Sequence, residues 1–376
     1  MIENPLLHPS RPSSFSHYLT KMKSQLFQFH ASEKEGAQRV EANSPFEWIP
    51  PDWKNSPSKK GVLLVHGLLD SPYSLKAIGK IFLKEQFLVR SILLPGHGTS
   101  PEELLNVSFK DWVKATRIAV DDLHYEVDEL FLVGFSGGAS LSLINTAHLK
   151  KLKGVALLSP AFQLRSKLLP FARWMATLGN FYPPFTWYER LEENDYAKYQ
   201  SVSYHLGKEA YELCQFNHSF LSKNPLSCPV FMALSEADET VCPKAALHFF
   251  KSHVASHPHE SNRCIIYNKN IEVFDSPHII SRTSYFPELH ILDFSHVCLP
   301  IPLSDPHYGL HGDYVPPLHM LERGENIPVS KIFYGALSRE NLQTYSLRRL
   351  HFNPDFDFLK RHLQNFIRQC VSAPLD

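Results

Sequence analysis

The 376-residue sequence has no excess of charge of either sign, because 38 basic side chains match 38 acidic ones. It also lacks a strongly basic stretch, which does not fit a nucleic-acid binder whose affinity comes from neutralising phosphates. A continuous apolar run of about 18 residues, the length that spans a bilayer as a helix, does not occur. The composition, with 43% hydrophobic and 20% charged residues, is typical of a globular protein.

Cysteine and histidine are present without the patterns that would make them structural. The six cysteines include no CxxC pair, and this usage predicts free, mostly buried thiols in a reducing compartment. The 21 histidines are scattered and lack a ligand spacing such as HExxH, so we expect no metal site. The N-terminus lacks the basic and apolar regions of a signal peptide, which makes the cytoplasm the default location.

Short apolar runs alternate with helical patterns along much of the chain. The expected strands are 61–67, 87–96, 129–136, 154–160, 229–238 and 288–296. The expected helices are 71–85, a helix capped by Ser108 and Asp111, a small-residue helix from 137, a helix from Pro243 to Val254, and a last helix after Asn353. This βαβ alternation predicts a mostly parallel sheet with right-handed crossovers and helices on both faces.

Two stretches interrupt this pattern, and they suggest a division of the chain. Residues 1–58 are rich in Ser and Pro, and we expect a weakly structured arm or one added element. The alternation breaks at 161–227, which is aromatic and helical in character. The α/β core would then consist of 59–160 and 228–376, with a long insertion at about 297–353.

The most informative motif is Gly-Phe-Ser-Gly-Gly at 134–138, which follows an apolar strand and begins a helix. A serine hydroxyl is a poor nucleophile at pH 7, so it has to be exposed and placed beside a base. The flanking glycines permit the tight strand-to-helix turn that does this. We therefore predict Ser136 as a nucleophile, with the N–H of Gly137 stabilising an oxyanion.

The partners of such a serine occur at fixed places along the chain. A second oxyanion donor comes from the loop after the first core strand, which makes Leu68 the candidate. His66 in the same loop is expected to brace it rather than act as the base.

An acid and then a histidine follow the serine in chain order, each beyond a later strand. Asp238 is the best-placed acid, with Glu236 and Glu239 as rivals, and His296 is the best-placed base. The other histidines considered are His290, His307 and His311.

Several segments together resemble a known family. The segments GVLLVHGLLDSP, SILLPGHGTSPEEL and LVGFSGG, with those around Asp238 and His296, are similar to the monoacylglycerol lipase, carboxylesterase and lysophospholipase group of α/β-hydrolases, also described as serine aminopeptidase-like. The likeness covers roughly residues 60–300. It implies an eight-stranded α/β-hydrolase core, the triad Ser136, His296 and Asp238, and Leu68 with Gly137 as oxyanion donors. It also implies that 161–227 is a helical cap inserted after the sixth strand.

The chain departs from the pattern of this group at three places. The interval from Asp238 to His296 is long, and the insertion at 297–353 is large. Asp70 stands where the group often has a small residue, which could alter preference near the oxyanion site. His97, in the Leu-Pro-Gly-His-Gly segment typical of the group, is expected to be architectural.

The resemblance implies a serine hydrolase that cleaves carboxylic esters through an acyl-enzyme and needs no metal or organic cofactor. The aromatic residues of 161–227 favour an apolar acyl group, although they could equally pack the cap onto the core. A thioesterase or peptidase with the same triad, or a catalytically silent hydrolase fold that binds a partner, stays open. The expected partner is a small-molecule or lipid ester. Peripheral membrane contact through the cap and the oligomeric state are left open.

Overall fold

The computed structural model describes residues 14–165, 174–178, 186–320 and 328–372. The chain forms two compact units. Unit 1 comprises Met1–Ala156, Ser166–Cys228 and Pro374–Asp376, and unit 2 comprises Leu157–Arg165 and Pro229–Ala373. We refer to the part of unit 1 from Ser166 to Cys228 as the insert.

The main sheet has eight strands in the order β1-β3-β2-β4-β5-β8-β9-β10. Strand β1 pairs antiparallel with β3, whereas β3 with β2, β2 with β4, β8 with β9, and β9 with β10 pair in parallel. The strands are β1 (Phe46–Trp48), β2 (Lys60–Val65), β3 (Leu88–Ser91), β4 (Glu129–Phe135), β5 (Leu152–Leu158), β8 (Val230–Ser235), β9 (Arg263–Asn268) and β10 (Ile279–Thr283). This order, with one antiparallel edge strand, is the α/β-hydrolase sheet that the sequence predicts.

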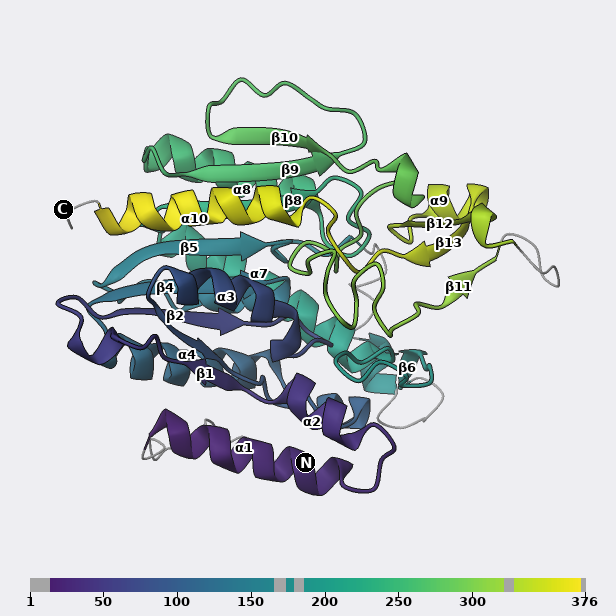
Figure 1. Ribbon diagram of the computed structural model, residues 1–376, viewed down its shortest axis with the longest axis horizontal. Helices are drawn as coiled ribbons and strands as arrows, with labels where there is room; N and C mark the ends of the chain where they lie inside the picture. The colour runs from purple at the N-terminus through teal and green to yellow at the C-terminus, as the bar shows by residue number, and fades with distance from the viewer. Residues whose placement is uncertain (1–13, 166–173, 179–185, 321–327, 373–376) are drawn as a thin grey trace. The chain divides into compact units, whose positions relative to one another are not determined.

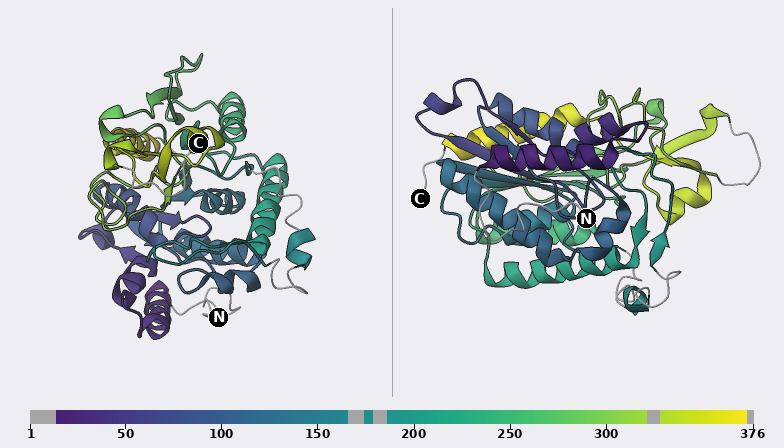
Figure 2. Two further views of the ribbon diagram at one scale, coloured as in Figure 1. Left: turned by 90° about the vertical axis from the view of Figure 1, so that its right-hand side faces the viewer. Right: turned by 90° about the horizontal axis from the view of Figure 1, so that it is seen from below.

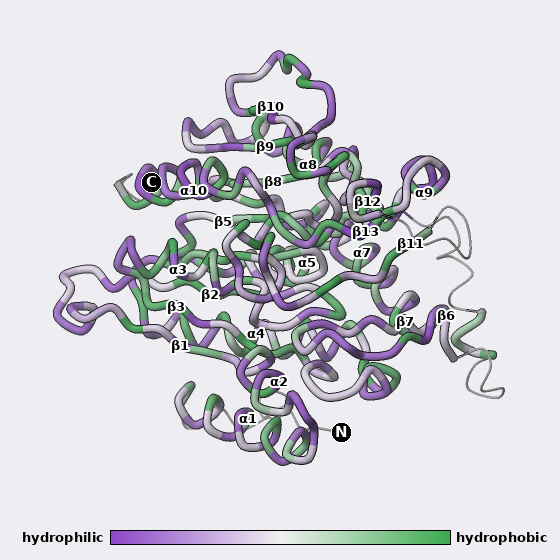
Figure 3. The backbone as a smooth tube through the Cα atoms, turned by 45° about the vertical axis from the view of Figure 1, so that its right-hand side comes forward, coloured by the Kyte–Doolittle hydropathy of each residue, from purple (hydrophilic) through white to green (hydrophobic). Residues whose placement is uncertain are grey.

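Strands β2 and β4 carry nearly continuous apolar residues, as expected for strands that are buried on both faces. Val62 to Val65 and Leu130 to Val133 have no exposed surface. Figure 3 shows β2 among the hydrophobic segments of unit 1.

The helices of unit 1 cover two faces of its strands. They are α1 (Phe15–His30), α2 (Gly36–Asn43), α3 (Lys76–Lys84), α4 (Phe109–Glu126), α5 (Gly137–Ile144) and α7 (Tyr204–Lys223). The chain moves from β2 to β3 in one direction and from β3 to β4 in the other. Right-handed crossovers therefore place α3 and α4 on opposite faces, as Figure 2 shows. The capping box predicted at Ser108 and Asp111 is present at the start of α4.

Helix α7 belongs to the insert and packs on the face that carries α4 and α5. Asn217 of α7 donates to the Ser140 hydroxyl of α5 at 3.2 Å. The buried Glu209 of α7 accepts from the Phe109 N–H at the start of α4 at 2.8 Å. The insert also holds a two-stranded sheet of β6 (Trp187–Glu189) and β7 (Val202–Ser203), so its described part is less helical than the sequence suggests.

The described residues of unit 2 form three α-helices and a second sheet. The helices are α8 (Pro243–Ser256), α9 (Arg339–Thr344) and α10 (Phe356–Ser372), and the second sheet has the order β11-β13-β12 with strands Leu318–His319, Ser346–Arg349 and Ile332–Gly335. This three-stranded sheet lies entirely within the insertion predicted at 297–353, and Figure 1 shows it beside α9. Short 3-10 helices occur at Trp53–Asn55, Pro72–Leu75, Pro101–Asn106, Pro287–Leu289 and Val329–Lys331.

The strand predicted at 288–296 is wrong. Residues 287–289 form a 3-10 helix, His290 adopts a left-handed backbone with φ 56°, and Ile291 makes only isolated bridges. The last two strands of the main sheet are instead β9 and β10, in the interval that looks polar and His-rich in sequence. Ile291 and Phe294 are buried without being in a strand, so the apolar pattern there reports burial and not extended pairing.

The N-terminal segment has more regular structure than the sequence predicts, and the cysteines are as expected. The N-terminal segment from residue 14 to 58 holds α1, α2 and β1, more than one added element. All six cysteines lie outside disulfide bonds, and five of them are buried. Within the described ranges, no helix combines the length and the apolar character needed to cross a membrane.

Candidate active site

Ser136 occupies the turn between β4 and α5 in unit 1. Its backbone has φ 55° and ψ −120°, a conformation that costs a residue with a side chain of the order of 1–3 kcal/mol. The serine is partly exposed, whereas Phe135 and Gly137 on either side are buried. A strained turn at the end of a buried strand has the geometry of the nucleophile elbow of α/β-hydrolases.

The two glycines around this turn leave no room for a side chain. A Cβ at Gly134 would lie 2.3 Å from Cα of Ala139, and a Cβ at Gly138 would lie 2.1 Å from the Val65 carbonyl oxygen. Both contacts are with backbone, which cannot rotate out of the way. The elbow therefore depends on glycine at these positions, as the sequence predicts.

The predicted oxyanion donors lie side by side. A Cβ built on Gly137 would be 2.9 Å from Cγ of Leu68, and one built on Gly67 would be 3.1 Å from Cβ of Ser136. The loop after β2 thus runs directly against the elbow. This places the Leu68 segment, the Gly137 segment and the serine in one small region of unit 1.

Two buried histidines hold the loop after β2 in place. Nε2 of His66 accepts from the Leu94 N–H at 3.0 Å while Nδ1 contacts the Gly67 carbonyl, and Nε2 of His97 accepts from the Leu69 N–H at 3.2 Å. Burial lowers the pKa of His66 to about 4. Burial, with a further effect of His66, lowers the pKa of His97 to about 3. Both rings are neutral at physiological pH and act as fixed acceptors, which is the bracing role expected of His66 and the architectural role expected of His97.

The insert also contacts this loop, and no motif in the sequence predicts this contact. The Tyr199 N–H donates to the Leu69 carbonyl at 2.9 Å. The Lys198 ammonium lies 3.8 Å from the buried Asp70 carboxylate. Burial raises the pKa of Asp70, and Lys198 and a hydrogen bond from Ser74 oppose that rise. Asp70 is therefore an internal anchor of the loop.

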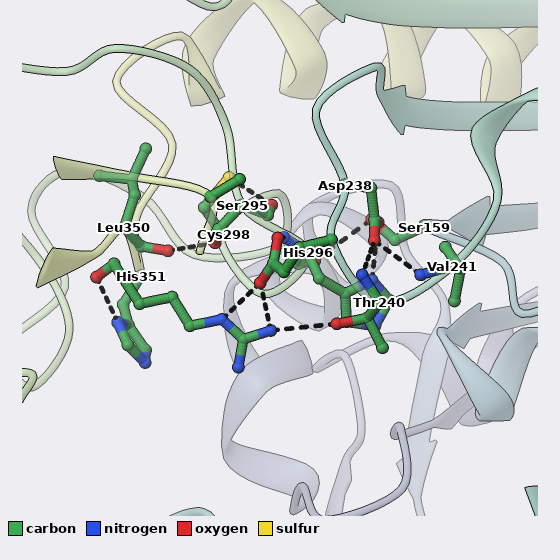
Figure 4. Close-up of polar contacts among 12 residues, drawn as sticks. Ser159, Asp238, Thr240, Val241, Ser295, His296, Cys298, Leu350 and His351 are labelled. Carbon is green, nitrogen blue, oxygen red and sulfur yellow. Dashed lines mark hydrogen bonds and ion pairs between the residues drawn. The ribbon is translucent and has the colours of Figure 1, made fainter. Parts of the chain in front are cut away.

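Asp238 and His296 form a buried hydrogen-bonded pair in unit 2 (Figure 4). Oδ2 of Asp238 lies 2.7 Å from Nδ1 of His296, while its Oδ1 accepts from the N–H groups of Thr240 and Val241 at 2.8 Å each. Asp238 is 1% exposed and His296 is 5% exposed. A carboxylate fixed in this way orients the imidazole with Nε2 outward from the pair. Asp238 lies in the loop after β8, as expected, but His296 lies in a loop and not at the end of a strand.

The rival residues of unit 2 have other partners. Glu236 is exposed, and Glu239 accepts from the His296 N–H at 3.1 Å and pairs with Arg349. His290 contacts the Ile332 carbonyl, and His307 pairs with Asp313. His311, the remaining rival, is exposed. Among these residues, Asp238 and His296 alone combine burial with a mutual contact.

The aromatic residues predicted to line a cap fall only partly within the described chain. Phe171, Phe181, Tyr182 and Phe185 lie outside the described residues. Trp174 is 73% exposed and Tyr188 is 62% exposed. Trp187 is partly buried under the Arg190 guanidinium, which lies 4.5 Å from its ring centroid.

The sheet order, the elbow at Ser136 and the predominance of parallel strands define an α/β-hydrolase. The family described as Serine aminopeptidase, S33 (Hydrolase_4) matches residues 56–265, which is more than half of the chain. The chain belongs to this family.

Individual relatives match over smaller parts. A segment of 104 residues is 30% identical to the thermostable monoacylglycerol lipase of Bacillus sp. (strain H-257), and it covers 28% of this chain and 42% of that lipase. The chain therefore matches less than half of the length of this curated relative.

Among solved structures, one from work on the metagenome-derived lipolytic enzymes LipS and LipT is 21% identical with a TM-score of 0.48, covering 60% of this chain and 86% of that one. The monoacylglycerol lipase of Paleococcus ferrophilus is 17% identical with a TM-score of 0.45, covering 64% and 88%.

Proposed function

We propose that this protein is a serine hydrolase that cleaves carboxylic esters with an apolar acyl group. In this proposal Ser136 is the nucleophile, His296 the general base, and Asp238 the acid that orients the base. The N–H groups of Leu68 and Gly137 form the oxyanion hole. The observation that carries the proposal is the left-handed backbone of Ser136 at φ 55°, because strain of this kind persists where it presents a reacting group.

The proposed reaction is acyl transfer to water in two halves. Oγ of Ser136 attacks the ester carbonyl while Nε2 of His296 takes its proton, and the negative charge moves to the carbonyl oxygen. Collapse of this intermediate breaks the bond to the alcohol, which leaves with the proton from His296. Water then attacks the acyl-enzyme in the same manner, releasing the acid and restoring Ser136.

The Asp238 contact supports the role given to His296. Nδ1 of the imidazole faces Oδ2 at 2.7 Å, so Nε2 is the nitrogen that exchanges the proton. The carboxylate also stabilises the imidazolium that forms. Because two backbone N–H groups bind its other oxygen, the carboxylate stays in place during the proton transfer.

The substrate class and the cap are inferred from the family and its relatives. The Bacillus relative is named as a monoacylglycerol lipase, which supports an apolar acyl group and a small alcohol as leaving group. We propose that residues 161–227 form the cap over an α/β core of 59–160 and 228–376, with 1–58 added at the edge. The contact between Tyr199 and Leu69 supports a cap that reaches the oxyanion loop.

Hydrolysis of p-nitrophenyl esters from acetyl to palmitoyl tests this function. We expect turnover that falls by about 10⁶ in Ser136→Ala and by a comparable factor in His296→Ala. The acyl chain length that is hydrolysed fastest indicates the length of the acyl pocket. If His296→Ala keeps activity that Ser136→Ala loses, the base is elsewhere and His307→Ala is the next variant.

A peptidase is the second candidate, because the family carries the name of a serine aminopeptidase. Aminoacyl p-nitroanilides distinguish it from an esterase, since an amide leaving group requires protonation that a p-nitrophenolate does not. Labelling with a fluorophosphonate separates both enzymes from a silent binding protein. Absence of labelling at Ser136 in a folded sample would contradict any serine-hydrolase function.

A further inference from the structure

The insertion that carries the three-stranded sheet reaches the loop of the proposed acid. Arg349 is the last residue of β13. Its Nε donates to Oε1 of Glu239 at 2.6 Å, and its Nη2 lies 2.5 Å from the same oxygen. Nη2 also donates to the Thr240 hydroxyl at 3.2 Å. One guanidinium therefore binds two consecutive residues that follow Asp238.

Glu239 connects this guanidinium to the proposed base. Its second oxygen, Oε2, accepts from the backbone N–H of His296 at 3.1 Å. Glu239 is also the chain neighbour of Asp238, whose carboxylate holds the His296 ring. Figure 4 shows His296 beside Asp238 and Thr240. The two residues of the acid–base pair are thus tied together twice, once through the ring and once through the backbone.

We infer that Glu239 and Arg349 are positioning residues for the pair of Asp238 and His296, and that their opposite charges balance each other beside the base. This inference rests on the proposed function of His296. Glu239 is a rival acid in the sequence, and the structure assigns it to this second role. Arg349 is supplied by a segment that the family resemblance does not cover.

The charges around His296 determine what each substitution should do. The described residues of unit 2 place the acidic groups Asp238, Glu239 and Asp293 near this site. The basic groups are Arg165 and Arg349, with Lys269 acting on Asp293. The nearby thiol of Cys298 stays protonated, because burial and these carboxylates raise its pKa. Removing one member of the Glu239–Arg349 pair leaves the other charge unbalanced.

The two single variants should shift the pKa of the base in opposite directions. Arg349→Met leaves the Glu239 carboxylate unpaired, which favours the imidazolium form of His296. The acidic limb of the pH profile of kcat/KM then moves to higher pH. Glu239→Gln leaves the guanidinium unpaired, which disfavours the imidazolium and moves the limb to lower pH. We expect each shift to be about one pH unit or less. The double variant, and Arg349→Lys, should return the limb close to that of the wild type.

Two measurements test this, and only one requires turnover. The first is the pH profile of kcat/KM on a p-nitrophenyl ester. The second is the pH titration of the His296 imidazole by NMR, with its signal assigned by its absence in His296→Gln. The pair of Arg282 and Asp355 is the control, because it has the same chemistry at 2.8 and 2.9 Å in the same unit but is not bonded to the acid–base loops. Arg282→Met and Asp355→Asn should leave the His296 titration unchanged.

The inference is supported if the His296 titration shifts in opposite directions in Arg349→Met and Glu239→Gln and returns to the wild-type position in the double variant. Shifts in the same direction, equal losses of kcat at every pH, or an unchanged titration overturn it and reduce the pair to a structural brace. If no ester is turned over, the NMR titration still decides the inference, and the proposed function fails separately.

Discussion

The Lys198 ammonium lies 3.8 Å from the Asp70 carboxylate, and their side chains are only 9% and 3% exposed. Asp70 lies in the loop after β2, and Lys198 lies in the insert. The side chain of Ser74 donates to Oδ1 of Asp70 at 2.6 Å. A charged contact with so little exposure to water ties the insert to the loop that carries the proposed oxyanion donor.

Lys198→Met should destabilise the fold by about 3 kcal/mol, because removing one partner leaves the buried Asp70 carboxylate without its cation. The double variant Asp70→Asn with Lys198→Met should lose less stability than Lys198→Met alone, because it no longer has an uncompensated carboxylate. Urea unfolding of the wild type, of the single variants Lys198→Met and Asp70→Asn, and of the double variant measures this coupling. Additive losses in the double variant would show that the two side chains do not interact.

Acid should destabilise the protein through His66 and His97. Both have pKa values in the fold, about 4 and about 3, below the ordinary value of 6.5. Between pH 6.5 and these values the unfolded chain binds more protons than the folded one, so stability falls as pH falls. Each unit of difference between the folded and unfolded pKa corresponds to about 1.4 kcal/mol. His66 alone should therefore lower the free energy of unfolding by roughly 3 kcal/mol at pH 4.

The free energy of unfolding from urea titrations between pH 7 and 4.5 measures this effect. In His97→Gln the free energy of unfolding should decrease less steeply with falling pH than in the wild type. His148→Gln, at an exposed histidine, should have the wild-type slope. A wild-type slope that persists in His97→Gln would contradict the prediction for that residue.

The two glycines beside Ser136 should respond very differently to alanine. In Gly138→Ala the new methyl group would lie 2.1 Å from the Val65 carbonyl oxygen and 2.4 Å from that of His66. We expect a loss of roughly 3 kcal/mol or more, since a backbone clash cannot be relieved by a rotamer change. In Gly137→Ala the nearest atom belongs to the flexible Leu68 side chain, so the loss should be smaller. Thermal unfolding of both variants compares them directly, and equal losses would argue against the backbone contact.

Replacing Ser136 by glycine should stabilise the protein relative to Ser136→Ala. Both variants lack the hydroxyl and should be inactive, but only glycine adopts φ 55° without strain. We expect a difference of about 1 kcal/mol in the free energy of unfolding. Calorimetry on the two variants measures it. A more stable alanine variant would mean that the turn is not strained.

The sequence carried enough information to predict the elbow, because its determinants are local. An apolar strand, two glycines and a small-residue helix around Ser136 leave few conformations for the turn. The roles proposed for Asp238 and His296 rest on their order in the chain after Ser136. The segment before His296 is nevertheless expected to be a strand, because it is rich in apolar residues. Two of them, Ile291 and Phe294, are buried in a loop instead.

Contacts between residues far apart in the chain could not be predicted. Arg349 contacts Glu239 across 110 residues, and Tyr199 of the insert contacts Leu69 in the loop after β2. Neither contact leaves a periodic or compositional pattern. Strand β10 is hard to predict for another reason, since it is mostly half-buried and its surroundings are polar.

The backbone contact between Tyr199 and Leu69 limits how this protein can be recombined with others. Leu69 is held from one side by His97 and from the other by Tyr199. A chimera that exchanges the whole insert for that of another hydrolase would remove one of these two supports. Crossover points that retain residues 195–199 would keep both, so the exchangeable part of the insert is shorter than its sequence boundaries suggest.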